Sequence, residues 1–101
     1  MKKLLSKGDY DIYQVDDGYV VHNRRMEGFA HSHIKNYKTA TWIVDLSIKH
    51  KLPQNLPKYL VISLLRINDN EKYLININAL LEKRNRKKIY YNSQKGIRKQ
   101  R

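Results

Sequence analysis

The sequence predicts an α+β fold, in which an antiparallel β-hairpin or three-stranded sheet is followed by three α-helices and a basic C-terminal tail. Three observations favour this order. β-branched and aromatic residues crowd residues 9–24 around an Asp-Gly turn signal. Apolar residues then recur at three- and four-residue steps in three successive segments, the period of an amphipathic helix. Finally, residues 83–101 carry nine Lys and Arg side chains and no acid.

The N-terminal part of the sheet is the predicted hairpin at residues 9–24. Asp17 and Gly18 are its expected turn residues, and in that register Val15 faces Val20. A third, short strand is expected within residues 28–34.

Three helices are predicted, from about residue 35 to 50, from 57 to about 67, and from the segment 68–71 to about 86. The second has almost no polar face, so it is expected at the centre of the domain. Asn68 is the predicted N-cap of the third helix, because Glu71 follows it at the spacing of a capping box. Trp42, on the first helix, is assigned to the core.

The length of 101 residues suits one domain, expected at residues 1–91, with a flexible basic tail at residues 92–101. The absence of cysteine excludes a disulfide framework, thiolate zinc sites and a cysteine nucleophile. The sequence shows neither a secretory signal nor an apolar run of the roughly 20 residues that span a bilayer, so a soluble, cytoplasmic protein without a membrane partner is expected. Lys, Asn, Ile and Tyr, which have A/T-rich codons, supply 41 of the 101 residues, which is typical of low-GC bacteria and their phages and mobile elements.

Positive charge is concentrated at the C-terminal end. The net charge is +12, but residues 1–22 have a balance of −1 and residues 83–101 have one of +9. A block of one sign repels itself, and an anionic partner would relieve that repulsion. The predicted polyanion-binding residues are Lys83, Arg84, Arg86, Lys87, Lys88, Tyr90, Tyr91, Lys95, Arg98, Lys99 and Arg101, helped by Arg24, Arg25 and Lys35.

The two tyrosines inside this block refine the predicted partner. Tyr90 and Tyr91 suit stacking on unpaired bases, so RNA or single-stranded DNA is favoured over a duplex, whose base faces are hidden. The first prediction is therefore a small protein that binds nucleic acid or a nucleoprotein. The alternative is an interaction protein of a phage or mobile element that inhibits a host defence nuclease, such as a Cas effector, in the manner of an anti-CRISPR protein. A solvated basic tail explains the same residues without a partner.

Histidine suggests a further hypothesis. His31 and His33 share one side of a strand, and an odd pairing register would bring His22 to the same side. Three imidazoles there are able to hold Zn²⁺ together with a carboxylate or water, so these residues are the candidate metal ligands. Three unrelated histidines on a wet sheet surface explain the pattern equally simply.

Sequence motifs bear on two other functions, DNA recognition by a helix-turn-helix and catalysis. The second and third helices, joined by a short turn, fit a helix-turn-helix with Lys72, Asn76 and Asn78 reaching bases, although an αα-hairpin built for core packing explains them too. No glycine-rich phosphate loop, nucleophile elbow or His-Glu-x-x-His motif is present in the sequence. No catalytic residue and no cofactor beyond the zinc are therefore predicted, and the chain is expected not to be an enzyme. A small nuclease that uses one of the three histidines with Arg24 or Arg25 is the enzymatic alternative.

Overall fold

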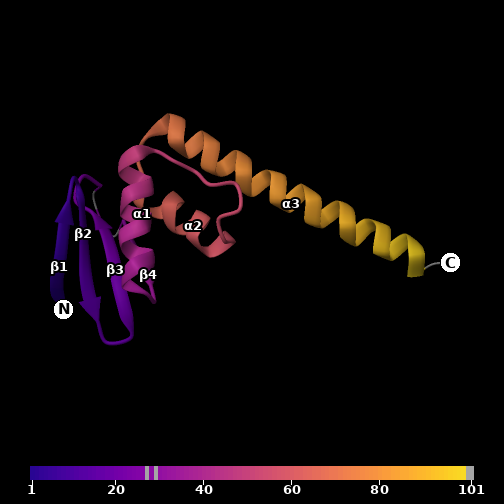
Figure 1. Ribbon diagram of the computed structural model, residues 1–101. Helices are drawn as coiled ribbons and strands as arrows, with labels where there is room; N and C mark the ends of the chain where they lie inside the picture. Colours follow the sequence, from indigo (N-terminus) through magenta and orange to yellow (C-terminus); the bar gives the residue numbers. More distant parts are fainter. Residues whose placement is uncertain (27, 29, 100–101) are drawn as a thin grey trace.

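The computed structural model is an α+β fold, with a four-stranded antiparallel sheet followed by three helices (Figure 1). It describes residues 1–26, 28 and 30–99, and within these the side chains up to Arg86. The predicted fold class is confirmed, but the sheet has one strand more than the two or three expected. The division into a domain at residues 1–91 and a tail at residues 92–101 stays a prediction, because it rests on side chains outside that description.

The sheet is a meander, in which each strand pairs with the next one in the sequence. Its strands are β1 (Lys2–Lys7), β2 (Tyr10–Val15), β3 (Gly18–Asn23) and β4 (His31–Ile34). The strand that the prediction lacks is β1, at the edge of the sheet. It is joined to β2 by a two-residue turn in which Gly8 has a φ of 57°, a conformation that glycine tolerates best.

The β2–β3 hairpin is shifted from the predicted register. Val15 pairs with Gly18 rather than with Val20, and residues 16–17 form the turn. Gly18 therefore opens β3, where a Cβ atom would stand 2.8 Å from the Ile34 carbonyl oxygen of β4. Glycine is needed here for two reasons: this close approach of the neighbouring strand, and a φ of 151° that L side chains rarely adopt. Because the shift is two residues, every side chain keeps its predicted face.

The helices α1 (Tyr37–Lys49) and α2 (Lys58–Ile67) confirm the first two predicted helices. The Asn36 side chain caps α1 by accepting a hydrogen bond from the Thr39 N–H at 3.3 Å. At the other end His50 takes the left-handed conformation, and its N–H bonds to carbonyls of the last turn. Residues 50–57 then form the α1–α2 connector.

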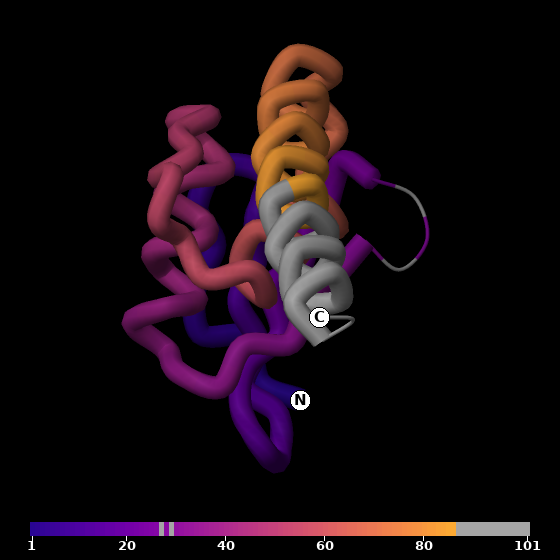
Figure 2. The backbone as a smooth tube through the Cα atoms, turned by 90° about the vertical axis from the view of Figure 1, so that its right-hand side faces the viewer, coloured from indigo at the N-terminus to yellow at the C-terminus, as the bar shows by residue number. Residues whose placement is uncertain are grey.

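The core lies between one face of the sheet and the helices, which start on the same side of it (Figures 1 and 2). The sheet contributes Ile12 and Val21. α2 occupies the centre as predicted, with Leu60, Val61 and Leu64 buried among the core side chains. The polar period-two positions of the sheet therefore face away from the helices, and this open face carries residues discussed below.

Trp42 does not belong to this core. Its side chain is 42% exposed, so its predicted place in the core is wrong. The adjacent Ile43 and Val44 are buried instead, because α1 turns only one stripe toward the sheet. Apolar character alone did not indicate which of three consecutive residues lies on that stripe.

α3 (Glu71–Lys99) begins at a different asparagine from the predicted one and extends past the predicted end at residue 86. Asn70 caps it, since its Oδ1 accepts a hydrogen bond from the Tyr73 N–H at 2.9 Å. Asn68, the predicted cap, is buried and bonds to other parts of the core. In the described part of the chain, no helix is both long enough and apolar enough to cross a membrane.

Candidate nucleic-acid interface

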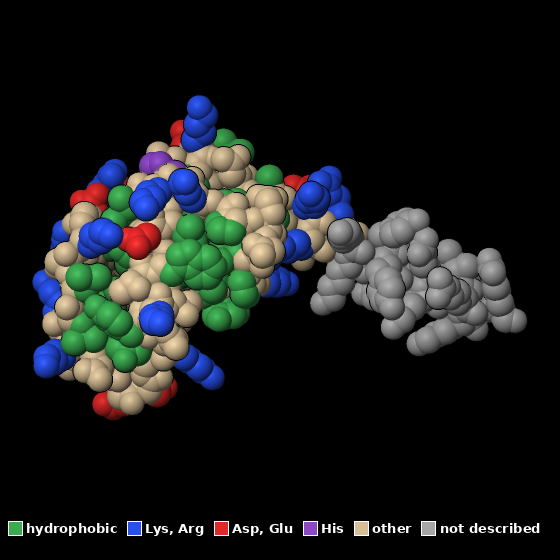
Figure 3. All heavy atoms as spheres, in the orientation of Figure 1, with side chains coloured by type: hydrophobic (Ala, Val, Ile, Leu, Met, Phe, Trp, Pro, Cys, Tyr) green, Lys and Arg blue, Asp and Glu red, His purple; other side chains and the backbone are tan. Residues whose placement is uncertain are grey.

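The first predicted polyanion-binding residues lie on α3, just after the turns of the helix that pack in the core. Tyr73, Ile77 and Leu80 bury the first turns of the helix, and the helix packs on α2. Lys83 and Arg86 follow on exposed positions. On the face drawn in Figure 3, basic side chains gather just before the residues shown in grey. The start of α3 is therefore structural, and its continuation leads the chain away from the core.

Eight predicted contact residues lie outside the described side chains, and their part in binding stays a prediction. They are Lys87, Lys88, Tyr90, Tyr91, Lys95, Arg98, Lys99 and Arg101.

The three described basic residues of the segment differ in what they contact. The Arg84 guanidinium donates to the Gln54 carbonyl of the α1–α2 connector at 2.7 Å. Arg86 lies 3.8 Å from Glu82, but both side chains are about 70% exposed, so this pair holds little energy. Lys83 has no carboxylate within 4.0 Å among the described residues. Arg84 thus fixes α3 to the connector, whereas Lys83 and Arg86 remain available to bind an anion.

Four of the nine acids form ion pairs at the other end of the molecule. Asp9, Asp11, Asp45 and Asp69 all form ion pairs with cations of the sheet and its loops. Residues 1–82 hold twelve cations and nine acids, so their net charge is +3, whereas residues 83–101 carry +9. The segment that begins on α3 is therefore the strongly uncompensated part of the chain.

Arg24, one of the predicted helpers, is fastened to a buried carboxylate. Asp11 is 1% exposed and pairs with the Arg24 guanidinium, which also donates to the Gly8 carbonyl. Burial on its own would raise the pKa of Asp11, but the Ser6 hydroxyl and the Arg24 and Lys3 charges outweigh it and lower the pKa. Leaving the buried Asp11 carboxylate unpaired would be costly, so the main role of Arg24 is to stabilise the sheet by pairing with it.

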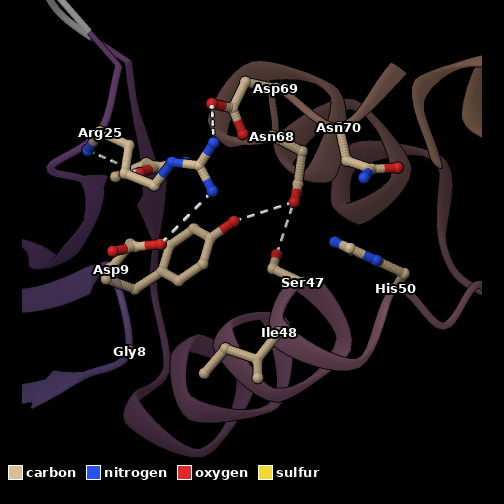
Figure 4. A pocket seen from close by; sticks show the side chains of 11 residues that line it. Gly8, Asp9, Arg25, Ser47, Ile48, His50, Asn68, Asp69 and Asn70 are labelled. Carbon is tan, nitrogen blue, oxygen red and sulfur yellow. Dashed lines mark hydrogen bonds and ion pairs between the residues drawn. The ribbon is translucent and has the colours of Figure 1, made fainter. Parts of the chain in front are cut away.

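Arg25 joins two loops that are far apart in the sequence. Its guanidinium lies 3.2 Å from Asp69, at the junction of α2 and α3, and 3.7 Å from Asp9, in the β1–β2 turn (Figure 4). All three side chains are exposed enough for water to screen the charges. As with Arg24, the positive charge is matched within the chain, and the predicted help from these two residues in polyanion binding gains no support from their contacts.

Behind Arg25 lies a polar cluster that the sequence did not reveal. Asn68 accepts a hydrogen bond from the Tyr10 hydroxyl at 2.9 Å and donates to the Ser47 hydroxyl at 3.0 Å (Figure 4). Asn23 donates to the Ile67 carbonyl at 2.9 Å. Among the described residues, no buried side-chain nitrogen or oxygen lacks a partner. A polar residue on an apolar stripe, as Ser47 is on α1, was the available signal.

The three histidines of the metal hypothesis share one face of the sheet. His22 pairs with His31 across β3 and β4, which is the odd register that the hypothesis requires, and the His31 and His33 rings lie 5.2 Å apart. They line a hollow of about 470 Å³ on the open face together with Tyr13 and other side chains. Within the described residues, however, no group of three or more His, Asp or Glu side chains is arranged to hold a metal ion. Zinc binding stays a prediction.

The helix-turn-helix hypothesis concerns α2 and α3. Lys72, Asn76 and Asn78 are exposed on α3, as that hypothesis requires. The turn between the helices, however, is fastened into the core through Asn68, which is the feature expected of an αα-hairpin built for packing.

Comparisons with protein-family models, with curated proteins and with solved structures found no match to this chain, so its function is argued from its own residues.

Proposed function

We propose that this chain binds nucleic acid, RNA or single-stranded DNA, through the basic segment at residues 83–101. The observation that carries the proposal is the placement of charge: nine cations without an acid follow residues 1–82, whose net charge is only +3 and where four acids pair with cations of the sheet and its loops. Cations of this kind neutralise phosphates and release counterions, which supplies most of the binding free energy of proteins that do not read sequence.

The position of the segment supports the same function. The first turns of α3 are fixed to α2 by buried side chains, and Arg84 is fixed to the α1–α2 connector. The helix therefore starts the segment from a rigid base. Ordering a flexible chain on binding costs conformational entropy, and a base of this kind reduces that cost.

The test compares two triple variants with the same change in net charge. Lys87, Lys88 and Lys95 are replaced by Gln in one, and Lys2, Lys38 and Lys58 in the other. The second set is exposed and outside the segment, and Lys38 and Lys58 lie in first helical turns, where losing a positive charge does not destabilise the helix. Binding to a fluorescent 20-nucleotide oligo(U) is measured by anisotropy as a function of salt.

For the unchanged protein, six to nine phosphate contacts give a slope of log affinity against log salt of about −4 to −6 on single strands. The segment variant loses about 2 from the magnitude of that slope, and the control variant loses much less. Equal losses in both would show that only net charge matters. Absence of any binding to oligo(U), oligo(dT) or duplex at low salt would end the proposal and would favour a protein partner, such as the host defence nuclease of the alternative hypothesis, to be sought by pull-down.

A further inference from the structure

A groove of about 390 Å³ lies beside the first described residues of the basic segment. One wall is α3 and the other is the α1–α2 connector. It is lined by His50, Leu52, Gln54, Asn76, Ala79, Leu80 and Lys83.

Two hydrogen bonds hold the walls of this groove at a fixed separation. The Tyr73 hydroxyl donates to the Lys51 carbonyl at 2.6 Å, and the Arg84 guanidinium donates to the Gln54 carbonyl at 2.7 Å. Tyr73 is buried, and burial raises the pKa of its hydroxyl, which therefore stays protonated and keeps its proton to donate. Each bond ties the connector to α3 at a different turn of the helix, so the groove exists before any ligand arrives.

The chemistry of the lining suits an anion. Of the described residues that form the groove none is acidic, and the side chains of Lys83, His50 and Asn76 offer hydrogen-bond donors. Lys51 is exposed and lies between the lining residues His50 and Leu52 in the sequence, so the connector carries a further cation. Charge complementarity thus favours a phosphate, and the open side of the groove leaves room for the backbone of a single strand to enter.

The groove also continues toward the segment. Four residues of α3 follow one another at steps of three, four and three, which places them on one stripe of the helix. They are Asn76, Ala79, Lys83 and Arg86, all exposed. A strand that occupied the groove would therefore run along α3 onto the basic residues that follow.

We propose that this groove binds the sugar–phosphate backbone of a single-stranded nucleic acid and guides it onto the basic segment. The inference rests on the proposed function and adds a second, preformed contact: Lys83, His50 and Asn76 from the groove hold one phosphate, and Lys51 and Arg86 lie near its neighbours. The α1–α2 connector, which looks like a plain linker in the sequence, becomes part of the binding surface.

The test places a negative charge in the groove without replacing any residue of the segment. Ala79→Glu adds a carboxylate on an exposed helical position in the groove, and Asn78→Glu adds the same charge on the same helix outside the lining. Both variants place Glu, a good helix former, in the helix, and circular dichroism checks that they fold. Affinity for oligo(U) is expected to fall at least tenfold for Ala79→Glu and less than about threefold for Asn78→Glu, because salt screens the more distant charge.

A direct readout accompanies the affinities. Amide resonances of His50, Leu52, Asn76 and Lys83 are expected to shift when oligo(U) is added to the full chain, in proportion to saturation of the anisotropy signal. Unshifted groove resonances, or equal affinities for the two variants, would overturn the groove while leaving the segment proposal intact, since the segment has its own charge variants. Displacement of oligo(U) from the groove by polyglutamate of equal charge would overturn the choice of nucleic acid as occupant. Loss of all binding in the unchanged protein would instead end the proposed function itself.

Discussion

Replacing Asn68 by alanine tests the polar cluster that joins the sheet, α1 and the start of α3. Asn68 is 3% exposed, accepts from the Tyr10 hydroxyl, and donates to the Ser47 hydroxyl and the Leu64 carbonyl. Asn68→Ala leaves the first two of these groups without their partner, and a buried group left unpaired costs about 1–3 kcal/mol. Two unpaired groups would together cost about 2–6 kcal/mol. Because the pocket beside the cluster has room for water that can bond to them in part, we expect the free energy of unfolding to fall by about 2–4 kcal/mol.

The matched comparison is Asn70→Ala, which removes a helix cap two residues away. Losing an N-cap typically costs about 1 kcal/mol, so the two asparagines should differ clearly. Asn55→Ala, on the exposed connector, should change stability by less than about 0.5 kcal/mol.

Urea denaturation followed by circular dichroism measures these differences. With an m-value of about 1.5 kcal/mol/M, Asn68→Ala lowers the midpoint by about 2 M and Asn70→Ala by less than 1 M. Tyr10→Phe removes one of the same hydrogen bonds, so the double variant with Asn68→Ala should cost about 1 kcal/mol less than the sum of the two. If Asn68→Ala costs no more than Asn70→Ala, the buried hydrogen bonds of Asn68 stabilise the fold no more than a helix cap does, and the reasoning from burial is refuted.

Two other perturbations follow from the sheet. The pKa of Asp11 is lowered in the folded state, so the stability it contributes is present above its unfolded pKa of about 4 and is lost as the pH falls through the lowered value. Asp11→Asn should therefore weaken the fold at pH 7 by leaving Arg24 unmatched, and should flatten the decline in stability between pH 5 and pH 2 measured by urea titration; an unchanged pH profile would show that other acids control it. Gly18→Ala should cost more than about 2 kcal/mol because its Cβ meets the Ile34 carbonyl, whereas Gly28→Ala, with open space around it, should cost less in thermal melts. Equal costs would show that backbone conformation alone decides both positions.

The helices could be read from the sequence because their signal is local. The spacing of apolar residues located α1 and α2 within about two residues, since period and capping act over one or two turns. The edge strand β1 had no such signal. Its residues Lys2, Lys3 and Lys7 are exposed, and with only Leu5 partly buried against the core the alternation that marks a half-buried strand is missing. Its pairing with β2, interrupted by an irregularity after Lys3, is a property of the partner strand as much as of β1.

The candidate site also has one part that the sequence predicts and another that only the folded structure reveals. The uneven placement of charge is a property of the sequence and was available at once. The use of Arg24 and Arg25 as partners of Asp11, Asp9 and Asp69 was not, because these contacts join residues that only the folded sheet brings together. The groove beside α3 was hidden for the same reason: its connector wall, held by Arg84, contains no motif, and its chemistry appears only when the connector lies against the helix.

A small change in the short turn before α3 has a large effect at the far end of this long helix. Residues 68–70 set the direction in which the helix starts, while its buried first turns and Arg84 hold it on the domain, and Arg86 lies about 22 Å along its axis from Glu71. A tilt of about 10° at this turn would swing that position by about 4 Å, roughly the full span of an ion pair. If the chain binds a partner through residues 83–101 as proposed, substitutions in these three residues that also shift the packing of α3 would redirect those cations without removing any of them, and would change the choice of partner from a position outside the binding surface.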